Sequence, residues 1–147
     1  MTKLTLDRQD LILALTSNLG EHDAAYYLDT EAGELILFCE DFKADPSYGI
    51  PEDIAVNPRY LEIIPFRSHD TFPLMEDFVS TLPEGEIANR LTKALEGKKP
   101  FRRFKDTLYD YPDIQDKWYQ FEDAALTKMT ETWCEENDIE FEWKKLG

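Results

Sequence analysis

Five cationic side chains lie within eight residues of a chain that is otherwise strongly acidic, in the segment LEGKKPFRRFKD at 95–106. Arginine binds carboxylates and phosphates through two parallel hydrogen bonds, and lysine adds a point charge on a long stem. A proline inside the segment is typical of a helix start, where free backbone N–H groups also attract anions. We therefore expect an anion- or partner-binding surface formed by Lys98, Lys99, Arg102, Arg103 and Lys105.

The positive charge of this segment needs a negative counterpart, because cations near a helix N-terminus oppose the helix dipole. Three counterparts are open: the chain's own carboxylates, an external anion or acidic partner, or solvent alone. Internal pairing would use carboxylates that the sequence places on neighbouring predicted helices. Those considered are Glu76, Asp77, Glu122 and Asp123.

Other residues that carry chemistry are few and scattered. The two histidines, His22 and His69, show neither the HExxH spacing nor a neighbouring cysteine pair. Cys39 ends a predicted strand beside two acids, which raise the pKa of a thiol, and Cys134 lies on a predicted helix. We therefore expect core cysteines, no metal site and no cofactor, and we assign no catalytic residue. One alternative is a divalent cation in the loop that carries Glu40, Asp41 and Asp45.

The overall charge limits the class of partner. Thirty-one acids against sixteen bases give a net charge of −15, which repels nucleic-acid backbones, so we expect no nucleic-acid partner. Charges more than about 8 Å apart are largely screened at physiological salt, so the basic segment can still act locally. The chain shows neither the apolar run of a signal peptide nor about 18 uninterrupted apolar residues. We expect a cytoplasmic protein with reduced thiols and no membrane contact.

The elements that must position the basic segment are helices with clear boundaries. Gly97 predicts the end of one helix, and Pro100 the start of the next. Phe101, Phe104 and Leu108 then recur at spacings of three and four, which predicts that this face binds the helix to the core. The same periodicity predicts helices over 68–82, 84–97 and from 112 to about 137.

The first half of the chain carries the β signals. The runs AAYYLD and ELILFC, joined by TEAG, predict an antiparallel hairpin of 24–29 with 34–39, and RYLEIIPF predicts a third strand. A helix is expected within 4–20, a loop over 40–58, and a short edge strand within 139–146.

We predict one α+β domain over 1–147: an N-terminal helix, a small antiparallel sheet of about three strands, then a C-terminal bundle of about four helices. The helices are expected to pack over one face of the sheet. The other face is then expected to be exposed, with an open edge that suits a partner strand.

Three stretches together resemble a known family: YYLDTEAGELILF, RYLEIIPFRSHDTFPLMEDFV and ALEGKKPFRRFKDTL. They resemble the bacterial uncharacterised protein family 0158, from about Tyr26 to about Asn137. The most specific element is G-x-x-P-F-R-R-F-K-D, which begins at Gly97. The resemblance implies a bacterial, cytosolic protein and carries over no catalytic residue.

The function that these patterns favour is a non-enzymatic interaction or regulatory module. Its basic segment would bind an acidic protein partner or a phosphorylated small molecule. One alternative is an enzyme for an anionic substrate, with Arg102 and Arg103 as the anion clamp and Glu40 or Asp41 as the base. Another is an acidic nucleic-acid mimic that binds a basic protein.

Overall fold

A computed structural model describes residues 3–17, 24–43 and 46–145 of the chain, without the side chains of residues 42 and 43. It divides into two compact units. We call Met1–Phe66 with Thr127–Gly147 the sheet unit, and Arg67–Leu126 the helical unit. His22 and Asp45, named above as candidate metal ligands, lie outside the described residues. That the chain folds as one domain stays a prediction.

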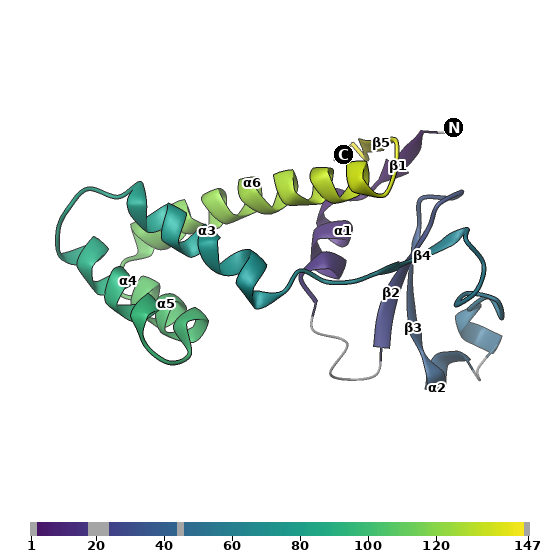
Figure 1. Ribbon diagram of the computed structural model, residues 1–147, viewed down its shortest axis with the longest axis horizontal. Helices are drawn as coiled ribbons and strands as arrows, with labels where there is room; N and C mark the ends of the chain where they lie inside the picture. The colour runs from purple at the N-terminus through teal and green to yellow at the C-terminus, as the bar shows by residue number, and fades with distance from the viewer. Residues whose placement is uncertain (1–2, 18–23, 44–45, 146–147) are drawn as a thin grey trace. The chain divides into compact units, whose positions relative to one another are not determined.

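The sheet unit contains the predicted three-stranded antiparallel sheet (Figure 1). Strand β2 (Ala24–Asp29) lies between β3 (Leu35–Cys39) and β4 (Tyr60–Ile63) and is antiparallel to both. Tyr26 is paired with Leu37 on one side and with Ile63 on the other. The predicted hairpin and third strand are therefore confirmed.

A second, two-stranded sheet was not expected in this form. Strand β1 (Leu4–Leu6) runs parallel to β5 (Phe141–Trp143), so the C-terminal strand is confirmed but its partner is a strand where we predicted helix. Helix α1 (Arg8–Leu15) begins only after Asp7, whose carboxylate accepts the backbone N–H of Asp10 at 3.0 Å. This cap satisfies a free N–H of the first turn and sets the helix start.

The core of the sheet unit joins both sheets to α1. Leu4 and Leu6 of β1, Leu28 of β2 and Leu11 and Leu15 of α1 are buried in one cluster. The face of the three-stranded sheet that points away from this core is buried at the central strand, because Tyr27 of β2 is only 8% exposed. The prediction that this face is open to solvent is therefore wrong at β2.

The stretch after β3 is partly helical rather than a plain loop. It forms α2 (Glu40–Lys43) and the 3-10 turn η2 (Pro46–Tyr48). Both elements are too short to show the periodicity by which a helix is recognised in a sequence.

The helical unit holds the remaining helices much as predicted. They are α3 (Ser68–Ser80), α4 (Glu86–Glu96), α5 (Pro100–Tyr109) and the first part of α6 (Pro112–Glu136), whose last part belongs to the sheet unit. Their shared core contains Met75, Phe78, Leu91, Phe104 and Trp118. The α+β class, the small antiparallel sheet and the helices that follow it are confirmed. Among the described residues, no helix combines the length and the apolar composition that crossing a membrane requires.

Candidate functional site

The basic segment is built on a tight turn between α4 and α5. Helix α4 ends at Glu96, and α5 begins at Pro100, where the missing N–H has no cost. Lys99 precedes the proline with φ of 52°, in the left-handed region. Figure 1 shows the two helices side by side, joined by this turn. Lys98 and Lys99 are therefore carried at the tip of a helical hairpin.

The apolar face of α5 fixes its orientation, as the sequence predicts. Phe104 is fully buried and meets the ring of Trp118 edge-on, with 5.0 Å between ring centroids. Phe101 lies edge-on to Phe72 at 6.2 Å, and Leu108 is buried one turn after Phe104. Since successive helical residues differ by about 100°, this anchoring turns Arg102 and Arg103 away from the core.

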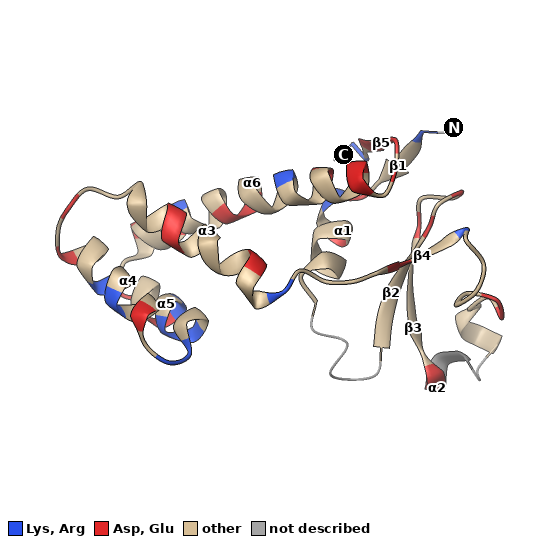
Figure 2. Ribbon diagram, in the orientation of Figure 1, with Lys and Arg blue, Asp and Glu red and all other residues tan. Residues whose placement is uncertain are grey.

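All five basic side chains are exposed. Figure 2 shows the Lys and Arg positions of the helical unit concentrated on α4, α5 and the turn between them. Arg102 has a side-chain exposure of 75%, and its Nε lies 4.0 Å from the carboxylate of Asp106 on the same helix. An exposed pair of this length contributes little to stability and leaves the guanidinium accessible.

Arg103 takes a position that the sequence did not predict. Its guanidinium folds back against the backbone of Gly97, so closely that a Cβ at Gly97 would clash with Nη1. The arginine therefore covers the turn and brings its charge toward the same end of the hairpin as Lys98 and Lys99. The glycine was predicted only as a helix stop, and nothing in its spacing indicates contact with a side chain six residues later.

In the described residues, no carboxylate of a neighbouring helix forms an ion pair with Arg102 or Arg103. Within the described part of the chain, the ion pairs of 4.0 Å or less place no carboxylate on Arg103, and only that of Asp106 on Arg102. Glu122, one of the acids considered above, interacts electrostatically with Lys105 instead. Burial raises the pKa of Glu122, and the charge of Lys105 opposes that rise.

Helix α4 adds a cation that the sequence analysis did not single out. Arg90 donates to the hydroxyl of Tyr111 at 2.6 Å and lies 3.3 Å from the carboxylate of Asp110. The hydrogen bond to Tyr111 raises the pKa of Arg90. Arg90 therefore connects α4 to the residues that follow α5.

The other candidate residues do not assemble into a reactive site. His69 is exposed and lies 3.3 Å from Asp70. Cys134 is buried, and burial raises its pKa to about 11, which keeps it a thiol at neutral pH. In the described ranges, no group of three or more His, Cys, Asp or Glu side chains is placed to hold a metal ion.

Two of the hollows formed by the described residues lie in the sheet unit. Leu4, Leu61 and Glu140 are among the residues that line one, and Thr5, Gly33 and Leu35 among those that line the other. None of the five basic residues lines either hollow.

The comparisons with known proteins agree over nearly the whole chain. The model of the uncharacterised protein family UPF0158 matches residues 1–145. UPF0158 protein PA5073 from Pseudomonas aeruginosa is 30% identical over 145 residues, which cover 95% of this chain and 88% of that protein. No solved structure matches.

Proposed function

Because the chain belongs to the uncharacterised protein family UPF0158, whose description assigns no activity, we propose a function from the geometry of the basic segment. The protein is a non-enzymatic interaction module. Its turn and α5 bind an acidic surface of a partner protein through Lys98, Lys99, Arg102, Arg103 and Lys105.

One observation carries this proposal: the two arginines are outside the core and are not neutralised by carboxylates of neighbouring helices in the described part of the chain. Phe104 anchors α5 while Arg102 keeps 75% of its side chain exposed. Guanidinium groups in this state retain their capacity for bidentate bonds to carboxylates. A solvated face without a partner would serve equally well with lysines, which do not offer that geometry.

The distribution of the charges favours a protein surface over a small phosphorylated molecule. The five cations follow the turn and the outer side of α5, and neither hollow described above includes them. Small ligands are usually held in concave sites by converging polar groups, whereas protein partners meet extended patches. Steering by such a patch raises association rates and weakens as salt is added.

No observation favours the enzymatic alternative to the same degree. The mimic alternative would leave the basic segment without a role.

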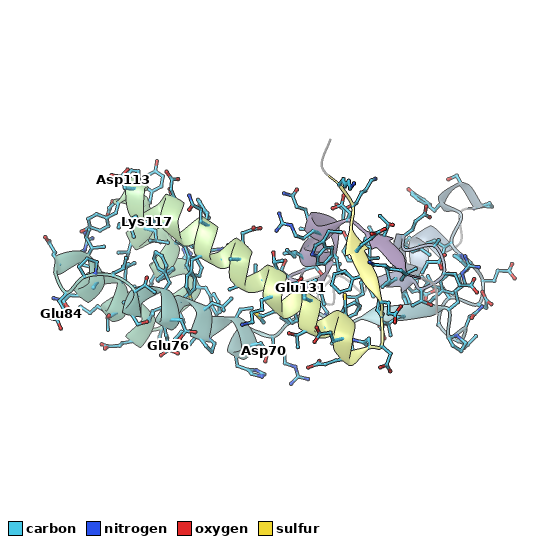
Figure 3. All side chains as sticks on the ribbon, turned by 90° about the horizontal axis from the view of Figure 1, so that it is seen from above. Asp70, Glu76, Glu84, Asp113, Lys117 and Glu131 are labelled. Carbon is cyan, nitrogen blue, oxygen red and sulfur yellow. The ribbon has the colours of Figure 1, made fainter. Side chains whose placement is uncertain are left out.

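The test is affinity capture from host cytosol with immobilised protein at low and at physiological salt. Wild type is compared with Arg102→Ala/Arg103→Ala and with the control Lys117→Ala/Lys128→Ala, which removes the same charge from exposed positions of α6 (Figure 3 labels Lys117). We expect an acidic protein that wild type and control retain, that the arginine variant loses, and that salt releases. Equal capture by all three proteins would contradict the proposal.

A second arm separates the protein partner from a small phosphorylated ligand. Capture is repeated in the presence of inorganic phosphate and of polyglutamate at matched ionic strength. Polyglutamate should compete for the basic segment, whereas phosphate should not. Competition by phosphate alone would assign the segment to a small anion.

A further inference from the structure

The larger of the two hollows is lined by residues of the sheet unit and has a volume of about 710 Å³. Four segments that are distant in the sequence form it: β1, the β2–β3 turn, the start of β4, and the chain between α6 and β5. We call it the acid-rimmed hollow. Its size falls within the range of ordinary ligand sites, so it can admit long side chains.

The lining of the hollow is partly apolar, with the polar residues Thr30 and Asn137 beside the apolar ones. Leu4, Pro58, Leu61 and Ile139 contribute to its lining. Leu4 is buried and Leu61 is half-buried against the core of the sheet unit. A hydrocarbon stem placed here would lose water on both sides, which is favourable in proportion to the area covered.

Three acidic residues are also among the lining residues: Glu31, Asp138 and Glu140. Glu31 is matched by Arg59, whose Nη1 lies 2.8 Å from its carboxylate. Asp138 and Glu140 are exposed, and no ion pair with another described residue involves either of them. Two of the three acidic lining residues, Asp138 and Glu140, are therefore not paired with a basic side chain of the described residues.

The end of α6 adds to the preference for a cation. Residues 137–140 follow the C-terminus of this 25-residue helix directly, where the helix dipole places partial negative charge. Positive charge is stabilised at such an end, and no basic residue lies in the last turn of α6. The C-terminal end of α6 and the carboxylates therefore both favour a positively charged ligand.

The walls of the hollow are held in place before any ligand arrives. The carboxylate of Asp29 accepts the N–H groups of Glu31 and Ala32 at 2.9 and 3.1 Å, which fixes the turn that carries Glu31. Among the other lining residues, the N–H of Leu4 donates to the carbonyl of Glu140 at 2.9 Å. A preformed site spends less of its binding free energy on ordering.

We infer that the acid-rimmed hollow binds lysine or arginine side chains of an extended segment from another protein. Each side chain would lay its hydrocarbon stem on the apolar lining and place its charge at Asp138 and Glu140. Long basic side chains combine these two properties, and small inorganic cations lack the first. This site is separate from the basic segment and has the opposite charge, so it goes beyond the function proposed above.

The probe is a fluorescein-labelled peptide, acetylated and amidated, in which lysine alternates with glycine over nine residues. Its affinity is measured by fluorescence anisotropy for wild type and for Asp138→Asn/Glu140→Gln. Asparagine suits position 138, where φ is 57°, so the variant should keep its fold. The control Glu76→Gln/Asp77→Asn removes the same two charges from exposed positions of α3.

We expect the rim variant to weaken binding at least about tenfold, while the α3 control changes it less than about twofold. A second peptide carries 2,3-diaminopropionate, which keeps the charge but shortens the stem, and it should bind at least about fivefold more weakly than the lysine peptide. Equal losses in rim variant and control would show general attraction to an acidic chain and would overturn the inference. So would equal affinity for both peptides, tighter binding of free spermine than of the peptide, or rim-dependent self-association that excludes the peptide.

Discussion

The guanidinium of Arg59 donates two hydrogen bonds to the carboxylate of Asp29, from Nε to Oδ1 and from Nη2 to Oδ2, both at 2.8 Å. Asp29 is the last residue of β2 and is only 6% exposed. The same carboxylate accepts two backbone N–H groups of the turn that follows. One side chain thus joins the β2–β3 turn to the residue that precedes β4.

This pair predicts a specific acid sensitivity. The hydrogen bond from Arg59 holds the pKa of Asp29 at about 2, below its ordinary value of 3.8, although burial acts in the opposite sense. A depressed pKa contributes stability that is complete above the ordinary pKa and is lost as pH falls toward about 2. The contribution is about 2 kcal/mol at neutral pH.

Asp29→Asn should therefore lower the free energy of unfolding by about 2 kcal/mol at pH 7, measured by urea denaturation. The difference from wild type should shrink between pH 4 and pH 2. The control Glu31→Gln removes an exposed carboxylate that also contacts Arg59, and its effect should stay below about 1 kcal/mol. A difference for Asp29→Asn that is constant down to pH 2 would contradict the assignment of the acid sensitivity to this carboxylate.

Gly33 is predicted to tolerate no side chain. Its φ is 75°, and a Cβ would lie 2.9 Å from the backbone carbonyl oxygen of Thr5. Gly33→Ala therefore combines left-handed strain with a clash against β1, and we expect a loss of about 2–4 kcal/mol in urea denaturation. Gly49 has a similar φ of 63°, but a Cβ there would have nothing within 4 Å, so Gly49→Ala should cost only about 1 kcal/mol. Equal losses at both positions would show that the contact with Thr5 has no effect.

The helices were predictable because their boundaries are marked in the sequence. Pro100 and Pro112 begin α5 and α6, and Gly97 follows the end of α4. The apolar spacing of Phe101, Phe104 and Leu108 was enough to place one face of α5 on a core. These signals are local, so they do not depend on where the rest of the chain lies.

The features that escaped prediction depend on contacts between distant residues. Strand β1 has three residues, too few for a period to be seen, and its partner is 137 positions away in the pairing of Thr5 with Glu142. The fold of Arg103 over Gly97 and the acid-rimmed hollow likewise arise only when the backbone is in place. The exposure of the five basic residues was predicted, but which carboxylates lie near them could not be read from the sequence.

Phe104→Ala should be the most damaging single change in the helical unit. The ring is fully buried and contacts Trp118, so its removal leaves a cavity in the core of α3–α6. We expect a loss of about 3–5 kcal/mol in urea denaturation. Tyr109→Ala, on the same helix at 78% exposure, is the control and should change stability by less than about 0.5 kcal/mol.

The same substitution, measured by hydrogen exchange, tests whether the chain is one domain. A single cooperative domain requires that Phe104→Ala lower the hydrogen-exchange protection of β2 in the sheet unit as well as that of α5. Protection that falls in α5 while the amides of Tyr27 and Leu28 keep theirs would contradict the prediction of one domain.

Gly97→Ala offers a change in the basic segment without a change in charge. A methyl group at this position meets the guanidinium of Arg103, which can swing away because it is the end of a long side chain. The backbone at Gly97 has φ of −99°, which alanine adopts without strain. The free energy of unfolding should therefore change by less than about 0.5 kcal/mol in urea denaturation.

If the partner is bound by Arg103 in its folded-back position, Gly97→Ala should weaken capture of the acidic partner although all five cations remain. This expectation rests on the proposed function. Gly85→Ala is the control, because a Cβ there has nothing within 4 Å and the position lies at the other end of α4. The contrary result is capture that is lost with Arg102→Ala/Arg103→Ala and unchanged with Gly97→Ala. That result would contradict the expectation, because the charge of the arginines would then be sufficient for binding and the folded-back position of Arg103 would have no effect.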